Sequence, residues 1–396
     1  MGTDLGPPAG QPWGDGINRP RILVLSTKSP FPPRGGDDVR LMGLLRAAAG
    51  LGDTTLAVWG ENRGSATEEV EIRTFPLTRL TILSGALGHA LSGRPLIVGP
   101  YARRFPVIEG HWDLVVGFQL KTWRWAQAVG ASIHVLDLVD SLSQYARSEG
   151  LPLLKKLQLL AIGTEETRAV RYFDQTWIST EADRSQIAGV EDGKVEVVPN
   201  GPLVVKALPR LEPGKSLLFV GNLVYPPNRQ GIEWFLKEVW PQLVPDGFSL
   251  DLVGNGSENF GQVPGVSAHG VVPELESFYA KADLAISPVQ WGGGSQLKIW
   301  EALGYGRSVI VTSAGSASFD PCPGILIADG AEKWVASIRR AVGSGVKTTR
   351  EIPSVTQNMG RVVATILKRG GGVGDGTARC LRRPDLGQRA SHDRDP

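Results

Sequence analysis

Cysteine and long apolar runs are scarce in this sequence. The 396 residues include two cysteines, Cys322 and Cys380, so we expect no disulfide framework and a reducing compartment such as the cytoplasm. No stretch reaches the ~18 uninterrupted apolar residues that a membrane span needs. Residues 1–20 lack the basic region and apolar core of a signal peptide. The chain is therefore predicted to be a soluble cytoplasmic protein.

An excess of charge of one sign is also lacking, because 42 Lys and Arg residues accompany 40 Asp and Glu residues. A basic face for nucleic acid is therefore not expected. The five histidines are scattered, and an Asp-x-Asp pair occurs only at Asp393 and Asp395, near the end of the chain. These patterns predict neither a nucleic-acid partner nor a bound metal.

Glycine and proline are abundant, with 50 and 28 residues, which predicts many short loops. Apolar runs typical of buried strands alternate with helical patterns, and the alternation occurs twice. The predicted fold class is therefore α/β, with two Rossmann-like doubly wound domains facing each other across a cleft. The predicted parts are a disordered N-terminal tail (1–20), an N-terminal domain (21–202), a linker (203–215), a C-terminal domain (216–354), a closing helix (355–369) and a disordered tail (370–396).

The segment Ser287–Val311 carries the clearest functional signal. Three consecutive glycines, at 292–294, follow an apolar run, and Ser295 then begins a helical pattern. Glycines allow a ligand to approach the backbone closely, and the free N–H groups and dipole of a helix N-terminus attract an anion. Lys298 and Glu301, one turn apart, add a cation for phosphate and a carboxylate for hydroxyl groups. The segment predicts a site for a sugar nucleotide or another phosphorylated ligand.

Each of these features has a plainer structural alternative. The glycines could form an ordinary turn before a Ser-capped helix, although three glycines exceed what such a cap needs. Lys298 could be a solvated lysine on the helix surface. Glu301 could be a surface residue without a function, but this alternative fits it less well because its neighbours in that turn are apolar.

Four motifs, taken in order, resemble the GT-B glycosyltransferases, specifically the retaining family 4. The resemblance extends from about residue 21 to residue 368 and depends on the order and spacing of the motifs. They are SPFPPRGGDDVR (29–40), VVPNGP (197–202), LFVGNL (218–223) and GGGSQLKIWEALGYGRSVIV (292–311). The resemblance implies a metal-independent retaining enzyme without a cofactor, which transfers a sugar from a nucleotide-diphosphate donor, a UDP-sugar first among the candidates, to a small-molecule, glycan or lipid acceptor. It assigns the acceptor to the N-terminal domain and the donor to the C-terminal domain.

The chain departs from the family pattern at three positions. Family members commonly pair two glutamates eight residues apart; Glu301 matches the second, and the first falls at Gly293. Many members also grip the diphosphate with an Arg and a Lys where this chain has Asn222 and Pro227. The resemblance then implies that the glycine-rich turn and Lys298 take over phosphate binding.

The remaining candidates also have alternatives. Gly35 and Gly36 would bring backbone amides to the donor phosphate or form a flexible turn. Asp140 follows an apolar strand and would bind or orient a sugar or acceptor hydroxyl, or cap the next helix. Asn222 would reach the phosphate or stabilise a turn, and Val271 lies in a loop that would read the base or simply connect two elements.

Three further residues are expected to be structural or secondary. Arg40 is interpreted as a helix-surface residue, His134 as a core histidine, and Asp137 as a weaker catalytic candidate than Asp140. The segment 78–104 mixes apolar residues with arginines and would form an acceptor-binding lip, a peripheral membrane contact or a solvated helical hairpin.

The predicted catalytic residues are thus Asp140 and Lys298. Two other functions stay open: a catalytically inactive nucleotide-sugar-binding subunit, and a sugar-nucleotide 2-epimerase, which would need a cleft with two carboxylates and a histidine. The sequence carries no indication of oligomeric state. The residues predicted to bind substrate are Gly35, Gly36, Asn222, Val271, Gly292, Gly293, Gly294, Ser295, Gln296, Leu297 and Glu301.

Overall fold

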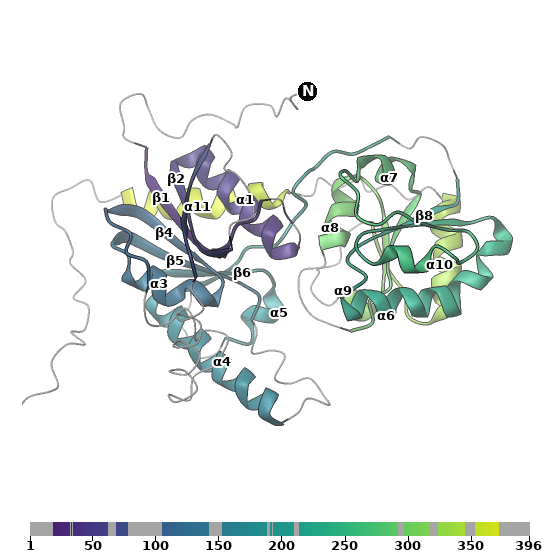
Figure 1. The fold of residues 1–396 in the computed structure, drawn as a ribbon, viewed down its shortest axis with the longest axis horizontal. Coiled ribbons are helices and arrows are strands. Elements are labelled where there is room, and N and C mark those ends of the chain that lie inside the picture. The colour runs from purple at the N-terminus through teal and green to yellow at the C-terminus, as the bar shows by residue number, and fades with distance from the viewer. Residues whose placement is uncertain are drawn as a thin grey trace, which may run out of the picture.

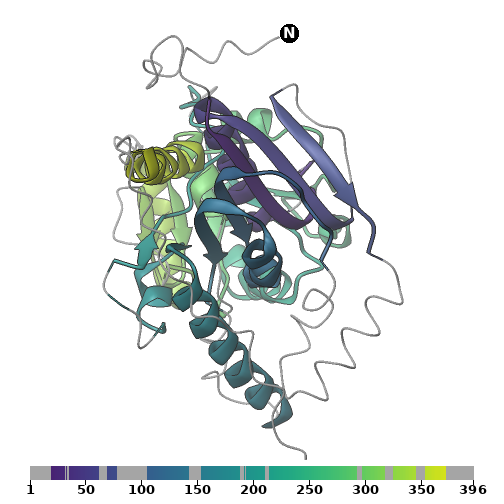
Figure 2. The ribbon, with the colours of Figure 1, turned by 90° about the vertical axis from the view of Figure 1, so that its left-hand side faces the viewer.

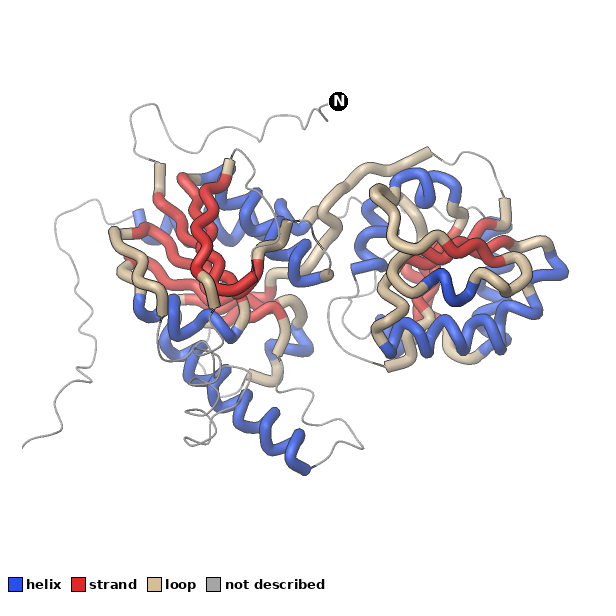
Figure 3. Tube along the Cα trace, in the orientation of Figure 1, coloured by secondary structure: helices blue, strands red, loops and turns tan. Residues whose placement is uncertain are grey.

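The computed structural model contains two parallel β-sheets, and the two halves of the molecule lie side by side along its longest axis (Figure 1). Figure 3 shows the strands at the centre of each half with helices around them. The prediction of two Rossmann-like α/β domains is thereby confirmed. The structure describes residues 19–31, 33, 35–61, 69–77, 105–141, 153–187, 191, 193–209, 214–291, 297–316, 324–344 and 353–371.

The first sheet has seven parallel strands in the order β3-β2-β1-β4-β5-β6-β7. In the interior strand β1, Ile22 and Val24 enter one core cluster, and Leu23 and Leu25 enter the cluster on the opposite face. Both faces of this strand are buried, which explains its uninterrupted apolar run. The strands are β1 (Arg21–Lys28), β2 (Asp53–Glu61), β3 (Val70–Phe75), β4 (Trp112–Phe118), β5 (Ala131–Val139), β6 (Gln175–Ile178) and β7 (Val195–Val197).

Helices cover both faces of this sheet. Helix α1 packs on the Ile22 face, and α3 and α4 contribute to the core on the Leu23 face. The 20-residue helix α4 projects beyond the sheet (Figure 1). None of the helices in the described ranges is long and apolar enough to cross a membrane. The elements are α1 (Gly36–Leu51), the 3-10 turn η2 (Leu120–Thr122), α3 (Trp123–Ala128), α4 (Leu153–Tyr172) and α5 (Glu181–Arg184).

The second sheet has six parallel strands in the order β10-β9-β8-β11-β12-β13. Its strands are β8 (Ser216–Val220), β9 (Ser249–Val253), β10 (Val266–Ala268), β11 (Leu284–Ser287), β12 (Val309–Val311) and β13 (Ile325–Ile327). Its helices are α6 (Pro226–Trp234), which continues as the π-helical turn η4 (Phe235–Val239), then α7 (Glu276–Lys281), α8 (Leu297–Gly304), α9 (Ser313–Ser316) and α10 (Ala331–Ser344). Short 3-10 turns are η5 (Trp240–Gln242), η6 (Val244–Asp246) and η7 (Ser257–Phe260).

The last helix, α11 (Val355–Gly371), returns to the first domain and packs beside α1 (Figure 2). The two helices approach closely at Gly43, where a Cβ atom would lie 2.5 Å from Cγ1 of Val355. The backbone N–H of Val355 donates to the carbonyl of Pro202, 3.0 Å away. The chain therefore passes from the first domain to the second before β8 and is back in the first domain at α11.

The structure differs from the sequence prediction mainly in short elements. Strands β7, β10 and β13, of three residues each, were not predicted, because so short an apolar run has no clear period. Helix α11 continues to Gly371, two residues into the segment that the sequence assigns to the tail.

Candidate active site

The carboxyl ends of strands from both sheets open onto one cavity of about 1300 Å³. Residues after β1, β4 and β5 line it from the first domain, and residues after β8, β10 and β11 together with α8 line it from the second. Doubly wound folds bind ligands at this edge. The predicted site residues that line the cavity are Gly35, Gly36, Asp140, Asn222, Val271, Leu297, Lys298 and Glu301. The other five, Gly292, Gly293, Gly294, Ser295 and Gln296, lie outside the described residues.

Helix α8 turns Lys298 and Glu301 toward the cavity because its other stripe is apolar. Ile299, Ala302 and Leu303 are buried in the core of the second domain. Residues three apart on a helix share a face, so the lysine and the glutamate lie together on the cavity side.

The Lys298 side chain is half-buried, and its Nζ atom lies 5.9 Å from the centre of the Phe219 ring. Burial lowers the pKa of Lys298 to about 8, because removal from water disfavours the ammonium form. Near neutral pH the side chain is mostly charged but incompletely solvated. An anion bound in the cavity would therefore interact strongly with it.

Glu301 is held by a tyrosine that the sequence did not single out. The Tyr279 hydroxyl donates to Oε2 of Glu301 across 3.1 Å, and the Tyr279 ring stacks on Tyr305 at 4.7 Å between centroids. Burial raises the pKa of Glu301 to about 7, and the Tyr279 hydrogen bond opposes that rise. Burial and the nearby Glu301 charge raise the pKa of Tyr279 well above its ordinary value. The glutamate is thus oriented, and it titrates near neutrality.

The first-domain wall begins with the N-terminus of α1. Gly35 is its N-cap residue, in extended conformation, and offers no side-chain cap. The next turn carries its own carboxylates: Lys28 Nζ pairs with Asp37 at 2.8 Å and with Asp38 at 2.6 Å. Gln119 Nε2 also donates to Asp37 Oδ2, 3.1 Å away. Gly35 and Gly36 therefore line the cavity beside paired acidic groups, and their contact with a donor phosphate stays a prediction.

Asp140 reaches the cavity through a strained strand end. Val139 has φ of 69°, an unfavourable value for a β-branched residue, and the β5–β6 register shifts between Asp137 and Val139. The Ser179 hydroxyl donates to Oδ1 of Asp140 across 2.7 Å. Burial raises the pKa of Asp140, and the Ser179 hydrogen bond partly offsets this effect. Strain of this kind costs about 1–3 kcal/mol and is concentrated at functional sites in proteins.

Two predicted substrate-binding residues of the second domain, Asn222 and Val271, line the cavity in different local environments. Asn222 Oδ1 accepts the backbone N–H of Val224 at 2.9 Å, so the turn-stabilising alternative is present in the structure. The side chain of Val271 is 75% exposed and follows Gly270, whose φ of 64° shapes the loop.

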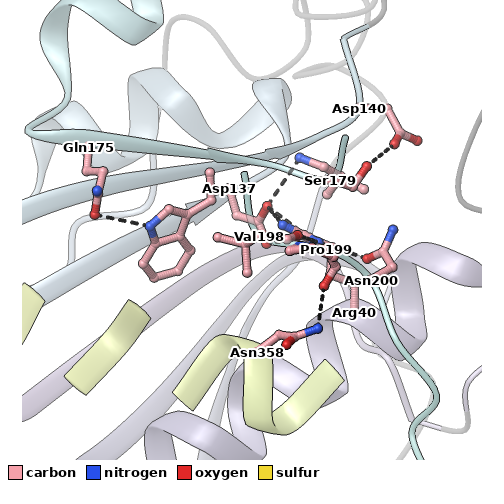
Figure 4. Close-up of polar contacts among 11 residues, drawn as sticks. Arg40, Asp137, Asp140, Gln175, Ser179, Val198, Pro199, Asn200 and Asn358 are labelled. Atoms are coloured by element: carbon pink, nitrogen blue, oxygen red, sulfur yellow. Dashed lines mark hydrogen bonds and ion pairs between the residues drawn. The ribbon is translucent and has the colours of Figure 1, made fainter. Parts of the chain in front are cut away.

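Arg40 is fully buried, so its prediction as a helix-surface residue is wrong. Its Nε atom donates to both carboxylate oxygens of Asp137, at 2.9 and 3.0 Å, and its Nη1 atom donates to the Val198 carbonyl and to Asn200 Oδ1, each at 2.8 Å (Figure 4). Asn358 Nδ2 on α11 donates to the carbonyl of Pro199, 3.0 Å away. The network joins α1, β5, the segment before the linker and α11.

This network also separates the two aspartates of β5. Asp137 is fully buried as the partner of Arg40 and is not part of the described cavity wall, whereas Asp140 is. The sequence did contain a signal for Arg40, because it lies four residues before the buried Leu44 on the same helix face. His134 is buried, as predicted, and its ring lies 2.9 Å from the carbonyl of Val129.

Several cavity residues were not predicted because no motif marks them. They include Gln119 and Lys121 after β4, Tyr225 before α6, and Trp291 after β11. Trp291 is 52% exposed, and its Nε1 atom donates to Gln230 Oε1 at 2.7 Å, which fixes the ring at the rim. Within the described ranges no group of three or more His, Cys, Asp or Glu residues could hold a metal ion. The predicted acceptor-binding lip or membrane contact at 78–104 lies outside these ranges.

Comparison with known proteins agrees with this geometry. Residues 214–344 match the family model described as "Glycosyl transferases group 1". This part of the chain is therefore similar to the group 1 glycosyltransferases. It contains Lys298, Glu301 and the whole second-domain wall of the cavity. The sequence resemblance is therefore confirmed at the level of the glycosyltransferase group and the GT-B fold.

Three relatives illustrate the likeness. An uncharacterized 44.6 kDa protein in the cps region of Klebsiella pneumoniae is 30% identical over 115 residues, which cover 26% of this chain and 30% of that protein. Sucrose-phosphate synthase from Thermosynechococcus elongatus has a similar structure, with a TM-score of 0.56 and 14% identity over 89% of this chain and 98% of that one. HepE from Anabaena, in complex with UDP and glucose, has a TM-score of 0.56 and 15% identity over the same shares of the two chains. At these identities, the likeness to the two solved structures concerns the fold.

Proposed function

We propose that this protein is a retaining glycosyltransferase that moves a sugar from a nucleotide-diphosphate donor to a hydroxyl acceptor. The observation that carries the proposal is the position of Lys298 and Glu301, on the part of the chain that is similar to the group 1 glycosyltransferases, facing Asp140 across one cavity. HepE shares the fold and has been solved with UDP and glucose, which supports a UDP-sugar as the donor.

In this proposal the donor binds to the second domain. Lys298 and the backbone amides of residues 292–295 hold the diphosphate, and Glu301 accepts hydrogen bonds from the ribose hydroxyls. Gln296 and Leu297 also bind the donor, and the backbone of the loop that carries Val271 reads the base. The Tyr279 hydrogen bond supports the role of Glu301, because it orients the carboxylate before the ligand arrives.

The reaction breaks the bond between the anomeric carbon and the diphosphate oxygen. The acceptor oxygen bonds to the same face of that carbon, and its proton passes to an oxygen of the departing phosphate. Negative charge grows on the diphosphate in an oxocarbenium-like transition state, where Lys298 stabilises it. Asp140 orients the acceptor hydroxyl from the opposite wall. We propose that these side chains and amides do this work without a metal.

One specific observation favours a second candidate, a catalytically inactive nucleotide-sugar-binding subunit. Gly293 occupies the place of the family's first glutamate, and Asn222 and Pro227 occupy the places of its phosphate-binding Arg and Lys. The 2-epimerase alternative receives no such support, because none of the described residues that line the cavity is a histidine.

Turnover by a Lys298→Ala variant tests the proposal. A thermal-shift screen against UDP, GDP, ADP and dTDP first identifies the nucleotide, and release of that nucleotide is then measured with its sugars and an acceptor pool. We expect the variant to lose about 10²-fold or more in turnover, because the leaving group loses its cation. A matched control, Lys237→Ala, alters a side chain that is 80% exposed outside the described cavity wall.

The outcomes separate the two candidates. Nucleotide release by the wild type that falls in the Lys298 variant, with unchanged melting temperature, supports the transferase. Tight nucleotide binding without release in any acceptor pool favours the inactive subunit. Normal turnover in a folded Lys298→Ala variant refutes the role of the lysine.

A further inference from the structure

Lys121 projects into the cavity from a turn that the surrounding structure holds in place. Gln119, directly after β4, has φ of 65° and ψ of 158°, a combination that costs a non-glycine residue about 1–3 kcal/mol. Its backbone N–H donates to the Asp137 carbonyl at 2.7 Å, and the Thr122 N–H donates back to the Gln119 carbonyl at 3.1 Å. Leu120, Thr122 and Trp123 are buried, so Lys121 is the partly exposed residue among these four. The strained turn thus delivers one lysine to the cavity.

Among the described residues, the Lys121 side chain forms no direct ion pair or hydrogen bond. The described residues lining the cavity include two lysines, Lys121 and Lys298, and five carboxylates, Asp37, Asp140, Glu274, Glu276 and Glu301. Asp37, whose charge acts to raise the pKa of Lys121, already pairs with Lys28 and accepts a hydrogen bond from Gln119. Burial lowers the pKa of Lys121, opposed by the Asp37 charge. A cation in this setting is stabilised by an anionic group of a ligand.

The position of Lys121 indicates which ligand carries that group. Strands β4 and β5 are neighbours, paired in parallel from Trp112 with Ala131 to Phe118 with Asp137. Lys121 and Asp140 follow these strands at the same sheet edge, on the wall opposite Lys298 and Glu301. A ligand that places a hydroxyl at Asp140 therefore faces the same wall of the cavity that carries Lys121.

We infer that Lys121 binds an anionic group of the acceptor, so the acceptor is a hydroxyl compound that carries a phosphate or a carboxylate. This inference depends on the proposed function, since it assigns the first-domain wall to the acceptor. It makes Lys121 a specificity-determining residue, which selects charged acceptors over neutral ones of the same shape.

Titration calorimetry with matched ligands tests the inference. UDP is titrated first, into wild type and into Lys121→Met, Lys121→Arg and Lys237→Met. The UDP-saturated proteins are then titrated with glucose 6-phosphate, glucuronate and glucose, which share a sugar ring and differ in charge. Circular dichroism and melting temperature confirm that each variant is folded.

We expect wild type to bind at least one anionic sugar about tenfold or more tightly than glucose, as a charge-assisted contact provides. Lys121→Met should abolish this preference and leave UDP affinity within about twofold, while Lys121→Arg should retain most of it and Lys237→Met all of it. Preference for glucose 6-phosphate alone or glucuronate alone identifies the group as phosphate or carboxylate.

Three results would overturn the inference. If wild type binds UDP but shows no preference for either anionic sugar, the acceptor assignment is wrong while the proposed function stands. If Lys121→Met weakens UDP itself, the lysine belongs to the donor site. If wild type binds no nucleotide, the proposed function and this inference both fail.

Discussion

Nucleotide binding should draw a proton onto Lys298. Burial lowers the pKa of this side chain from 10.5 to about 8 in the ligand-free protein. Since each pKa unit corresponds to about 1.4 kcal/mol, the ammonium form is disfavoured by about 3 kcal/mol at most. A diphosphate placed against the amine reverses this effect, because an opposite charge favours the protonated form.

The magnitude follows from the fraction of neutral lysine. Near pH 8 about half of the Lys298 side chains are neutral, and a return toward the ordinary pKa protonates nearly all of them. UDP binding should therefore take up about half a proton near pH 8 and close to one proton near pH 9. Glu301, with a pKa of about 7, is almost fully ionised in this range and contributes little.

Calorimetry in buffers of different ionisation enthalpy measures this uptake directly, because the observed enthalpy varies linearly with the number of protons exchanged. A Lys298→Met variant should bind UDP more weakly and without the pH-dependent uptake. The Lys237→Met control should reproduce the wild-type slope. Wild type that binds UDP near pH 9 with no proton uptake, or a methionine variant with the same uptake, would show that Lys298 does not meet the diphosphate.

Further predictions concern stability and pH. Arg40→Met leaves the buried Asp137 carboxylate unpaired and should lower the free energy of unfolding by about 3–5 kcal/mol. The control Arg229→Met removes an exposed ion pair and should change this free energy by about 1 kcal/mol or less. Equal effects of the two substitutions in urea titration would contradict the Arg40 network. Gly43→Ala places a Cβ against Val355 and should destabilise by about 1–3 kcal/mol, and a second change, Val355→Ala, should recover part of the loss if the contact between α1 and α11 is the cause. Because the folded-state pKa of Glu301 is raised to about 7, its protonated form adds stability below about pH 4.5 that is lost as the pH rises through about 7. Glu301→Gln should therefore gain stability relative to wild type by up to about 3 kcal/mol between pH 5 and 8, and parallel stability curves would refute the shift.

The cavity side of α8 was predictable because its information is local. Lys298 and Glu301 lie three residues apart beside an apolar stripe, and that spacing alone places them on one helix face. The loops after β4 gave no such signal. Lys121 lies in a stretch of mixed polarity, and its position at the cavity depends on the positive φ of Gln119. No residue pattern predicts that backbone conformation.

Arg40 shows the same limit inside the fold. A charged residue on an apolar helix face is tolerated only with buried partners, and its partners Asp137 and Asn200 lie 97 and 160 residues further along the chain. The surface prediction was wrong because it used only the general tendency of arginine to be exposed. Burial of this arginine depends on the partners that the tertiary structure places around it.

The sequence by itself determined the two doubly wound sheets and the anion-seeking character of α8, because apolar periodicity and neighbouring residue types act over a few positions. Only the tertiary structure decided that α11 returns to α1, that Arg40 is enclosed, and that Lys121 and Asp140 share one wall opposite Lys298. These arrangements depend on contacts between residues that are remote in sequence. Such contacts stabilise the protein only once the chain has packed, so local sequence patterns do not reveal them.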